Sequence, residues 1–172
     1  MGLFDFLKKK EVKEDVALEP VTVDDEAVVA LADGKVFDIT EVADPVFSQK
    51  MMGDGVAFSF AGDKTVLCAP ANGTLTVLFP TGHAFGITAN NGVEILVHCG
   101  IDTVNANGDG FKLLGKKQGD TVKAGEPIVQ VDLKKLSANY DMSTMLIITN
   151  ANGKEISFVE PKEVKRGEPV IK

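Results

Sequence analysis

Residues 81–102 have the sequence TGHAFGITANNGVEILVHCGID and carry the strongest structural signal in the chain. Two apolar runs, rich in β-branched and aromatic residues, flank the segment Asn90-Asn91-Gly92. Asn and Gly between two such runs are typical of a hairpin turn. The chain has only two histidines, His83 and His98, and one lies on each side of this turn. We therefore predict a β-hairpin with one imidazole on each strand.

The length of the turn decides whether the two imidazoles lie on the same face of the hairpin. A four-residue loop places His83 directly opposite His98, whereas a two-residue type I′ turn makes the two histidines diagonal neighbours. Only a three-residue loop would separate them, because a slip of one residue moves a side chain to the other face. We expect one of the first two registers, and therefore adjacent imidazoles.

The rest of the chain predicts an all-β fold, an antiparallel β-sandwich or barrel. From residue 27 onward, short segments rich in Val, Ile, Leu, Phe and Thr alternate with Gly, Asn, Asp or Pro, and their even spacing is typical of such folds. Helices are expected to be short, within PVFSQKMM and DLKKLSANY. The expected strand segments are AVVALA, GKVFDIT, GVAFSF, KTVLCAP, GTLTVLF, GVEILVHC, PIVQVDL, TMLIITN and EISFVE.

Two pairs of similar sequence segments indicate a duplicated β-motif. VKAGEPIV at residues 122–129 recurs as VKRGEPVI at residues 164–171, and ADGKV at residues 32–36 resembles ANGTL at residues 71–75. Turn chemistry alone accounts for the shorter match. A match over eight positions favours duplication.

Length, charge and hydropathy restrict the class of protein. The 172 residues suit a single domain, which we place at residues 27–172, after a flexible N-terminal segment at residues 1–26. A net charge of −7 argues against a nucleic-acid partner. No apolar run is long enough to span a membrane and no signal peptide is visible, so we expect a cytoplasmic protein. Residues 2–10 could form an amphipathic helix that contacts the inner face of the membrane, or simply a frayed terminus.

Two neighbouring imidazoles could bind a metal, act as acid and base, or accept a phosphoryl group. A metal site needs further ligands, for which the sequence offers nearby Asp54 or Asp102 but no His-x-His pair. Phosphoryl acceptance needs one nucleophilic nitrogen and donors for the transferred oxygens, a role open to the second imidazole and to Thr81. The remaining alternative is that the two histidines are cross-strand neighbours on the surface and have no function.

The histidine motifs lead to a family resemblance. FPTGHAFGI followed by EILVHCGIDTV resembles the glucose-type IIA component of the bacterial phosphoenolpyruvate–sugar phosphotransferase system. The resemblance extends to DPVFSQKMMGDGVAF, APANGTLTVLFPTGHAF, GDGFKLL and GDTVKAGEPIVQVDL, and so covers nearly the whole chain from about residue 27. The start, MGLFDFLKK, is also similar to family members.

The resemblance implies a phosphotransferase that works without a cofactor. His98 would take a phosphoryl group from the phosphohistidine of the carrier protein HPr and pass it to a cysteine of a IIB domain, driving sugar uptake and phosphorylation. His83, supported by Thr81, would hold the phosphoryl oxygens. No metal is required, although His83 and His98 could bind zinc adventitiously, and a monomer suits such a shuttle.

The resemblance also implies an apolar docking face with an acidic rim around the histidines. Core packing is the alternative for any single apolar residue of this set. Cys99 follows His98 where relatives commonly carry a larger apolar residue, and we expect it and Cys68 to be buried free thiols. The implied docking residues are Val46, Phe47, Met51, Met52, Phe79 and Leu96, with Asp44 and Asp102 at the rim.

Three other functions compete with phosphoryl transfer as the main role. The protein could act mainly as a regulator that signals through its phosphorylation state. A zinc metallopeptidase on a related duplicated β-fold would need a His-x-His pair, which the sequence lacks. A lipoyl- or biotin-carrier domain would need a modifiable lysine at a hairpin tip, and Lys35 is the nearest candidate.

Overall fold

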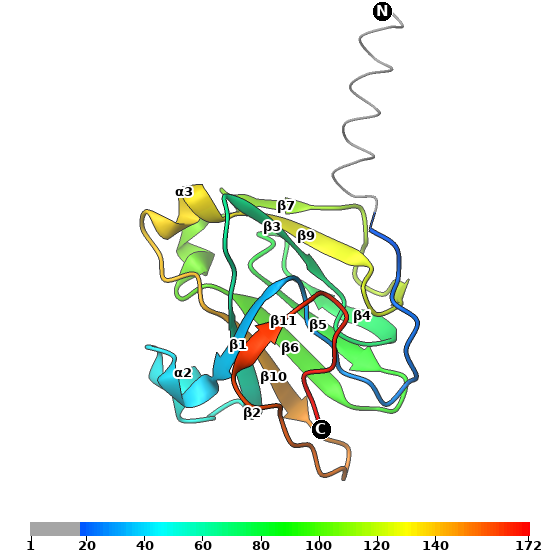
Figure 1. Cartoon of the computed structure of the whole chain (residues 1–172). Helices are drawn as coiled ribbons and strands as arrows, with labels where there is room; N and C mark the ends of the chain where they lie inside the picture. The colour runs from blue at the N-terminus through cyan, green and yellow to red at the C-terminus, as the bar shows by residue number, and fades with distance from the viewer. Residues whose placement is uncertain (1–17) are drawn as a thin grey trace, which may run out of the picture.

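The computed structural model describes residues 18–172, which form two facing antiparallel β-sheets (Figure 1). The larger sheet has eight strands in the order β11-β1-β2-β10-β6-β5-β4-β8, and the smaller has the order β3-β9-β7. The strands are β1 (Gly34–Asp38), β2 (Asp54–Ser59), β3 (Lys64–Cys68), β4 (Gly73–Leu78), β5 (Ala84–Ala89), β6 (Glu94–Cys99), β7 (Phe111–Leu113), β8 (Thr121–Val122), β9 (Pro127–Asp132), β10 (Thr144–Asn150) and β11 (Lys162–Val164).

The expected all-β class is confirmed, and the helices are short. They are α2 (Pro45–Ser48), α3 (Leu133–Ser137) and two 3₁₀ turns, η1 (Ile39–Glu41) and η2 (Thr103–Ala106). Both helices fall inside the segments predicted for them. Within residues 18–172, no helix has the length and apolar character needed to cross a bilayer.

Two of the expected strands are wrong. Residues 27–32 and 155–160 form only the isolated bridges Val29↔Pro169 and Phe158↔Ile171. The Val29 N–H donates to Pro70 O, and the next N–H, of Ala30, donates to Glu168 O. Because successive residues bond to different segments, residues 27–32 form no strand ladder, although residues 28–32 are buried.

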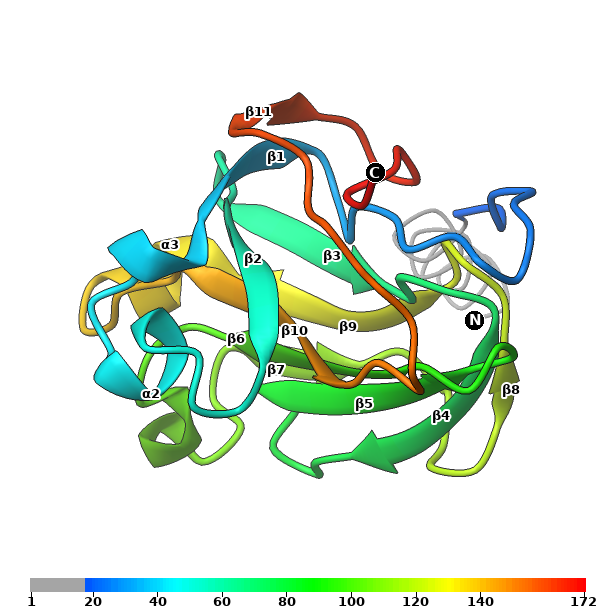
Figure 2. The same ribbon diagram turned by 90° about the horizontal axis from the view of Figure 1, so that it is seen from below.

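Strands β2 and β10 divide the apolar core into two clusters. Phe58 and Leu146 belong to the main cluster between the two sheets. Met145 and Ile147 point the other way, into a smaller cluster that contains Phe47 of α2. Since β10 pairs with both β2 and β6 and is buried on both faces, it needs the continuous apolar run MLII. The smaller cluster fixes α2 against the sheet, at one end of the molecule (Figure 2).

The predicted duplication is visible in the hydrogen bonds. In the first copy the Glu126 N–H donates to Lys123 O over 3.0 Å, and the Lys123 N–H donates to Glu126 Oε1 over 2.6 Å. In the second copy Glu168 and Lys165 make the same two bonds at the same distances. The two eight-residue motifs therefore fold into the same turn.

Each copy of this turn also pairs with one of the two Ala-Asx-Gly segments. β8 lies beside β4 with Val122 opposite Gly73, and β11 lies beside β1 with Val164 opposite Gly34. The two pairs of similar segments thus belong to one repeated unit. In each copy of this unit, the strand that begins at the glycine of Ala-Asx-Gly pairs with the strand that leads into Val-Lys-x-Gly-Glu-Pro.

Residues 18–26, expected to be part of a flexible segment, lie against the domain and are bonded to it. The Val21 N–H donates to Ala124 O over 2.8 Å, and Arg166 Nη1 donates to Glu19 O over 2.9 Å. This anchoring fixes the chain across the end of the molecule that lies away from α2 (Figure 2). Residues 2–10, for which an amphipathic helix and a frayed terminus were the two alternatives, lie outside the described residues.

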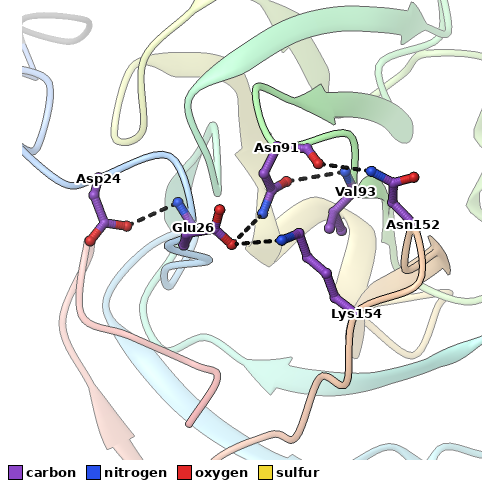
Figure 3. A network of polar contacts seen from close by, with 6 residues as sticks. All are labelled: Asp24, Glu26, Asn91, Val93, Asn152 and Lys154. Carbon is purple, nitrogen blue, oxygen red and sulfur yellow. Dashed lines mark hydrogen bonds and ion pairs between the residues drawn. The ribbon is translucent and has the colours of Figure 1, made fainter.

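A polar network joins this segment to the turn between β5 and β6 (Figure 3). Glu26 Oε2 accepts a hydrogen bond from Asn91 Nδ2 over 3.1 Å and lies 3.2 Å from Lys154 Nζ. Asn91 Oδ1 accepts the Val93 N–H over 3.1 Å, and Asn152 Nδ2 donates to Asn91 O over 3.0 Å. The turn is therefore held on several sides by polar bonds.

Candidate active site

The β5–β6 hairpin has neither of the two registers predicted for it. Ala84 lies opposite His98 and Ile87 opposite Ile95, so residues 90–92 form a three-residue loop. The prediction was wrong because the side chain of Asn91 takes part in the turn by accepting the Val93 N–H. Loop length depended on this local bond, which residue types alone did not specify.

The two imidazoles are adjacent nevertheless. Their ring centroids lie 5.3 Å apart with the planes at 80°. His83 precedes β5 and follows Gly82, whose φ is +76°, so the alternation of a regular strand does not fix its side chain. The predicted adjacency is confirmed, through an irregular strand entry rather than through the predicted register.

A backbone carbonyl sets the tautomer of His98. Its Nδ1 lies 2.8 Å from Gly100 O, and because a carbonyl only accepts, Nδ1 must carry the proton. Neutral His98 therefore presents an unprotonated Nε2. Gly100 has φ +80°, and a Cβ there would lie 2.4 Å from Thr103 Cγ2, so this carbonyl position requires glycine. The Phe47 ring packs 5.2 Å from the His98 ring.

A hydroxyl orients His83. Thr81 Oγ1 lies 2.7 Å from His83 Nδ1, and a hydroxyl can donate or accept. When Thr81 donates, Nε2 of His83 carries the proton and becomes a donor. The Phe79 ring lies 5.2 Å from the His83 ring, and His83 is only 5% exposed, whereas His98 is half-buried.

Burial keeps both imidazoles neutral. Desolvation lowers the pKa of His83 below its ordinary value of 6.5, and the nearby His98 lowers this pKa further. Desolvation also lowers the pKa of His98, although the Gly100 carbonyl and the charges of Asp44 and Asp102 oppose this effect. Both rings are therefore uncharged at neutral pH, and the His98 lone pair is available as a nucleophile.

Several of the apolar residues implied as docking residues are exposed. Met51 is 69% exposed, Met52 and Phe79 are each 42% exposed, and Val46 is 39% exposed. Sequence reasoning missed Val104, which is 52% exposed on η2, soon after Asp102. A lone valine in the polar stretch DTVNANGDG gives no sequence signal for exposure.

The other implied docking residues occupy different positions. Phe47 is buried and contacts His98, and Leu96 is half-buried against the smaller core cluster, so neither is an exposed docking residue in this structure. The Asp44 side chain accepts the Val46 N–H over 2.9 Å and caps α2. Asp102 is exposed at the start of η2.

The two cysteines are buried and free, as predicted. Burial raises the pKa of each thiol to about 12, so neither is a reactive thiolate. Asp54 lies 3.2 Å from Lys50 in an exposed ion pair, and Lys35 lies inside β1 rather than at a hairpin tip. Among residues 18–172, no three His, Cys, Asp or Glu side chains are grouped to hold a metal ion.

Comparison with known proteins identifies the family. Residues 26–154 match the model of the phosphoenolpyruvate-dependent sugar phosphotransferase system family EIIA 1. The chain belongs to this family. It is accordingly a phosphocarrier component of a sugar phosphotransferase system, with the histidine pair at its candidate centre.

Individual relatives agree with this assignment. The chain is 41% identical over 145 residues to a PTS system glucose-specific EIICBA component of Staphylococcus carnosus (strain TM300), covering 84% of this chain and 21% of the relative. A glucoside-specific EIICBA component of the same organism is 37% identical over 159 residues, covering 91% of this chain and 22% of the relative. The chain thus spans about a fifth of the length of these curated relatives.

A solved structure matches over most of both chains. The glucose permease IIA from Mycoplasma capricolum is 40% identical, with a TM-score of 0.78, and the match covers 84% of this chain and 93% of that one. The two proteins therefore share a fold over most of this chain.

Proposed function

We propose that His98 accepts a phosphoryl group from phosphorylated HPr and passes it to a cysteine of a IIB domain of a sugar permease. The observation that carries this proposal is the Nδ1–Gly100 hydrogen bond, which leaves Nε2 of a neutral imidazole unprotonated. The Nε2 lone pair attacks phosphorus in line, the P–N bond of the donor breaks, and its electron pair returns to the donor imidazole. The second transfer repeats this exchange with the cysteine thiolate as the attacking group.

His83 is proposed as the positioning group for the transferred phosphoryl. With the Thr81 hydroxyl donating to Nδ1, the Nε2–H of His83 can donate to a phosphoryl oxygen on His98. The ring centroids lie 5.3 Å apart, so the two imidazoles are near enough for His83 to serve a group carried by His98. A fixed donor in a partly desolvated site stabilises the charge that develops during transfer.

The exposed apolar residues around the histidines are proposed as the docking face for both partners. Met51 and Met52 have flexible, polarisable side chains that adapt to different surfaces in turn. Asp44 and Asp102 give the rim negative charge, which speeds encounter with a basic partner surface. In this proposal residues 27–172 are the carrier unit, a cytoplasmic monomer whose active face is open to each partner.

A labelling experiment tests the roles of the two histidines. Phosphoenolpyruvate, enzyme I and HPr should phosphorylate the wild-type chain, with a label that is acid-labile and alkali-stable. We expect His98→Ala to abolish labelling, and His83→Ala to accept the label but fail to pass it to a IIB domain. Labelling of His98→Ala at the wild-type rate would show that another residue is the nucleophile.

A matched pair of surface variants tests the docking face. Met51→Ser should raise the KM for HPr about fivefold, because one exposed interface side chain contributes roughly 1 kcal/mol. Leu18→Ser is the control, since Leu18 is also an exposed apolar residue but belongs to the N-terminal segment anchored at the other end. Equal effects of the two variants would contradict the proposed face.

A further inference from the structure

The chain contains four Asn-Gly pairs, beginning at Asn72, Asn91, Asn107 and Asn152. In such a pair the peptide nitrogen of glycine can attack the side-chain carbonyl carbon of asparagine, because glycine has no Cβ to obstruct the approach. The attack requires the two atoms to reach a near-attack geometry. Hydrogen bonds that hold the asparagine amide in another orientation therefore slow the reaction.

Three of the four asparagine amides are held by hydrogen bonds. Asn72 Nδ2 donates to Val23 O over 3.0 Å, and its Oδ1 accepts the Ala124 N–H over 2.9 Å. Asn91 is bonded through both side-chain atoms in the network of Figure 3, and Asn152 donates from Nδ2 to the Asn91 carbonyl in the same network. These amides must break native bonds before they can react.

Asn107 differs from the other three. It is exposed, ends η2 in a left-handed conformation with φ +52°, and its side chain makes no hydrogen bond to any of residues 18–172. The peptide N–H of Gly108 likewise donates to no group in this described part of the chain. Both reacting groups are therefore available in the folded protein.

We propose that Asn107-Gly108 is a site of spontaneous deamidation in the native protein. The Gly108 peptide nitrogen loses its proton to a water-derived base and bonds to Cγ of Asn107, and the side-chain nitrogen leaves as ammonia. Water then opens the resulting succinimide at one of its two carbonyls. The products are aspartate, with the original main chain, and isoaspartate, in which the main chain gains one methylene.

The modification occurs next to the candidate active site. A methyl group on Gly108 would lie 3.6 Å from the Thr81 Cα, and the Thr81 hydroxyl bonds to His83. Either product adds a negative charge there, and isoaspartate also lengthens the backbone beside Thr81. If His83 positions the phosphoryl group as proposed above, the isoaspartate form should transfer more slowly than the unmodified protein.

Mass spectrometry of aged protein tests the modification without reference to activity. The folded chain is kept in warm, mildly alkaline buffer, and fragment ions locate each replacement of an amide by a carboxylate. Asn107 should react roughly 5- to 30-fold faster than Asn72, Asn91 or Asn152, the factor expected for loss of one or two hydrogen bonds. In urea the four rates should converge. Equal native rates, or an unmodified Asn107, would overturn the proposal.

Two variants test whether local hydrogen bonds, rather than the Asn-Gly sequence itself, set the rate of deamidation at each site. Glu26→Ala removes one partner of the Asn91 amide, so it should speed reaction at Asn91 and leave the rate at Asn107 unchanged. Asn107→Gly keeps a residue that tolerates the left-handed conformation and should abolish modification at this position. A rise at Asn107 in the Glu26 variant would instead indicate general loosening of the fold and contradict selective protection.

The consequence for transfer is measured separately. Asn107→Asp carries the new charge without the longer backbone, so its phosphoryl acceptance should exceed that of purified isoaspartate protein. Equal rates for isoaspartate and unmodified protein would overturn the effect on the site. In that case the mass spectra would still establish deamidation at Asn107. Labelling of His98 in protein that is not deamidated would still test the proposed function.

Discussion

The two ends of the β5–β6 hairpin are built on different principles. At the turn, Asn91 is bonded through its side chain and its carbonyl to Glu26 and Asn152 of two other segments, and to Val93 of its own turn. At the other end, each imidazole uses Nδ1 for a hydrogen bond, while neither Nε2 bonds to any group within residues 18–172. One end uses its polar atoms to fix the chain, and the other leaves polar atoms and apolar side chains available to partners.

Gly100→Ala should disturb the histidine end most. The new Cβ would lie 2.4 Å from Thr103 Cγ2, so the carbonyl that orients His98 must move. We expect phosphoryl acceptance to fall about 100-fold, the typical cost of misplacing a reacting group by about 1 Å. Single-turnover labelling by phosphorylated HPr measures this rate.

Gly153→Ala is the matched control for this change. Gly153 has φ +76°, close to that of Gly100, but a Cβ there meets nothing within 4 Å. The control should therefore lose about 1–2 kcal/mol of unfolding free energy through backbone strain and keep its transfer rate. If both variants transfer at the wild-type rate, the Gly100 carbonyl does not orient the nucleophile.

Lowering the pH should also act at the histidine end, by a smaller and reversible amount. Because burial lowers the pKa of His98 below 6.5, acceptance should stay constant through pH 6.5 and should fall, by roughly tenfold per pH unit, only below this lowered pKa. Asp102→Asn removes a charge that raises this pKa, so its midpoint should lie at still lower pH. Comparing the two proteins with the same donor cancels the titration of HPr. A midpoint that rises in Asp102→Asn would contradict this electrostatic account.

Asn91→Ala should have the smallest effect on transfer, because it changes only the turn end. Loss of two side-chain hydrogen bonds should lower the free energy of unfolding by about 1–2 kcal/mol. Urea unfolding measures this change, and the labelling rate should stay at the wild-type value. A large loss of labelling in a folded Asn91→Ala protein would show that the two ends are coupled.

The sequence predicts strands well where burial and pairing coincide. TMLIITN forms β10 over the predicted residues, because a strand paired on both edges and buried on both faces needs a continuous apolar run. AVVALA has the same appearance but bonds to two different segments. Apolar runs therefore reveal burial, whereas the identity of the hydrogen-bonding partners depends on the tertiary fold. β7, β8 and β11 are too short to give a periodic signal.

In the candidate site, too, the residue types predict one part of the arrangement, and the rest depends on the tertiary fold. The two histidines could be found from their rarity and from their places on either side of a turn, but their contact depends on the irregular chain at Gly82. The hydrogen bond from His98 to Gly100 depends on a left-handed glycine that only the folded loop reveals. Residue types thus identify the reacting groups, and backbone geometry decides their tautomers and exposure.

The position of β10 in the larger sheet has a consequence for folding during synthesis. β10 pairs with β2 and with the His98 strand β6, both of which are translated long before it. Until residues 144–150 leave the ribosome, β2 and β6 each present an unpaired edge, and such long-range pairing folds slowly. Exposed strand edges are prone to pair with other chains, so the nascent protein should depend most on chaperones during this interval. The carrier becomes competent only when its last central strand arrives.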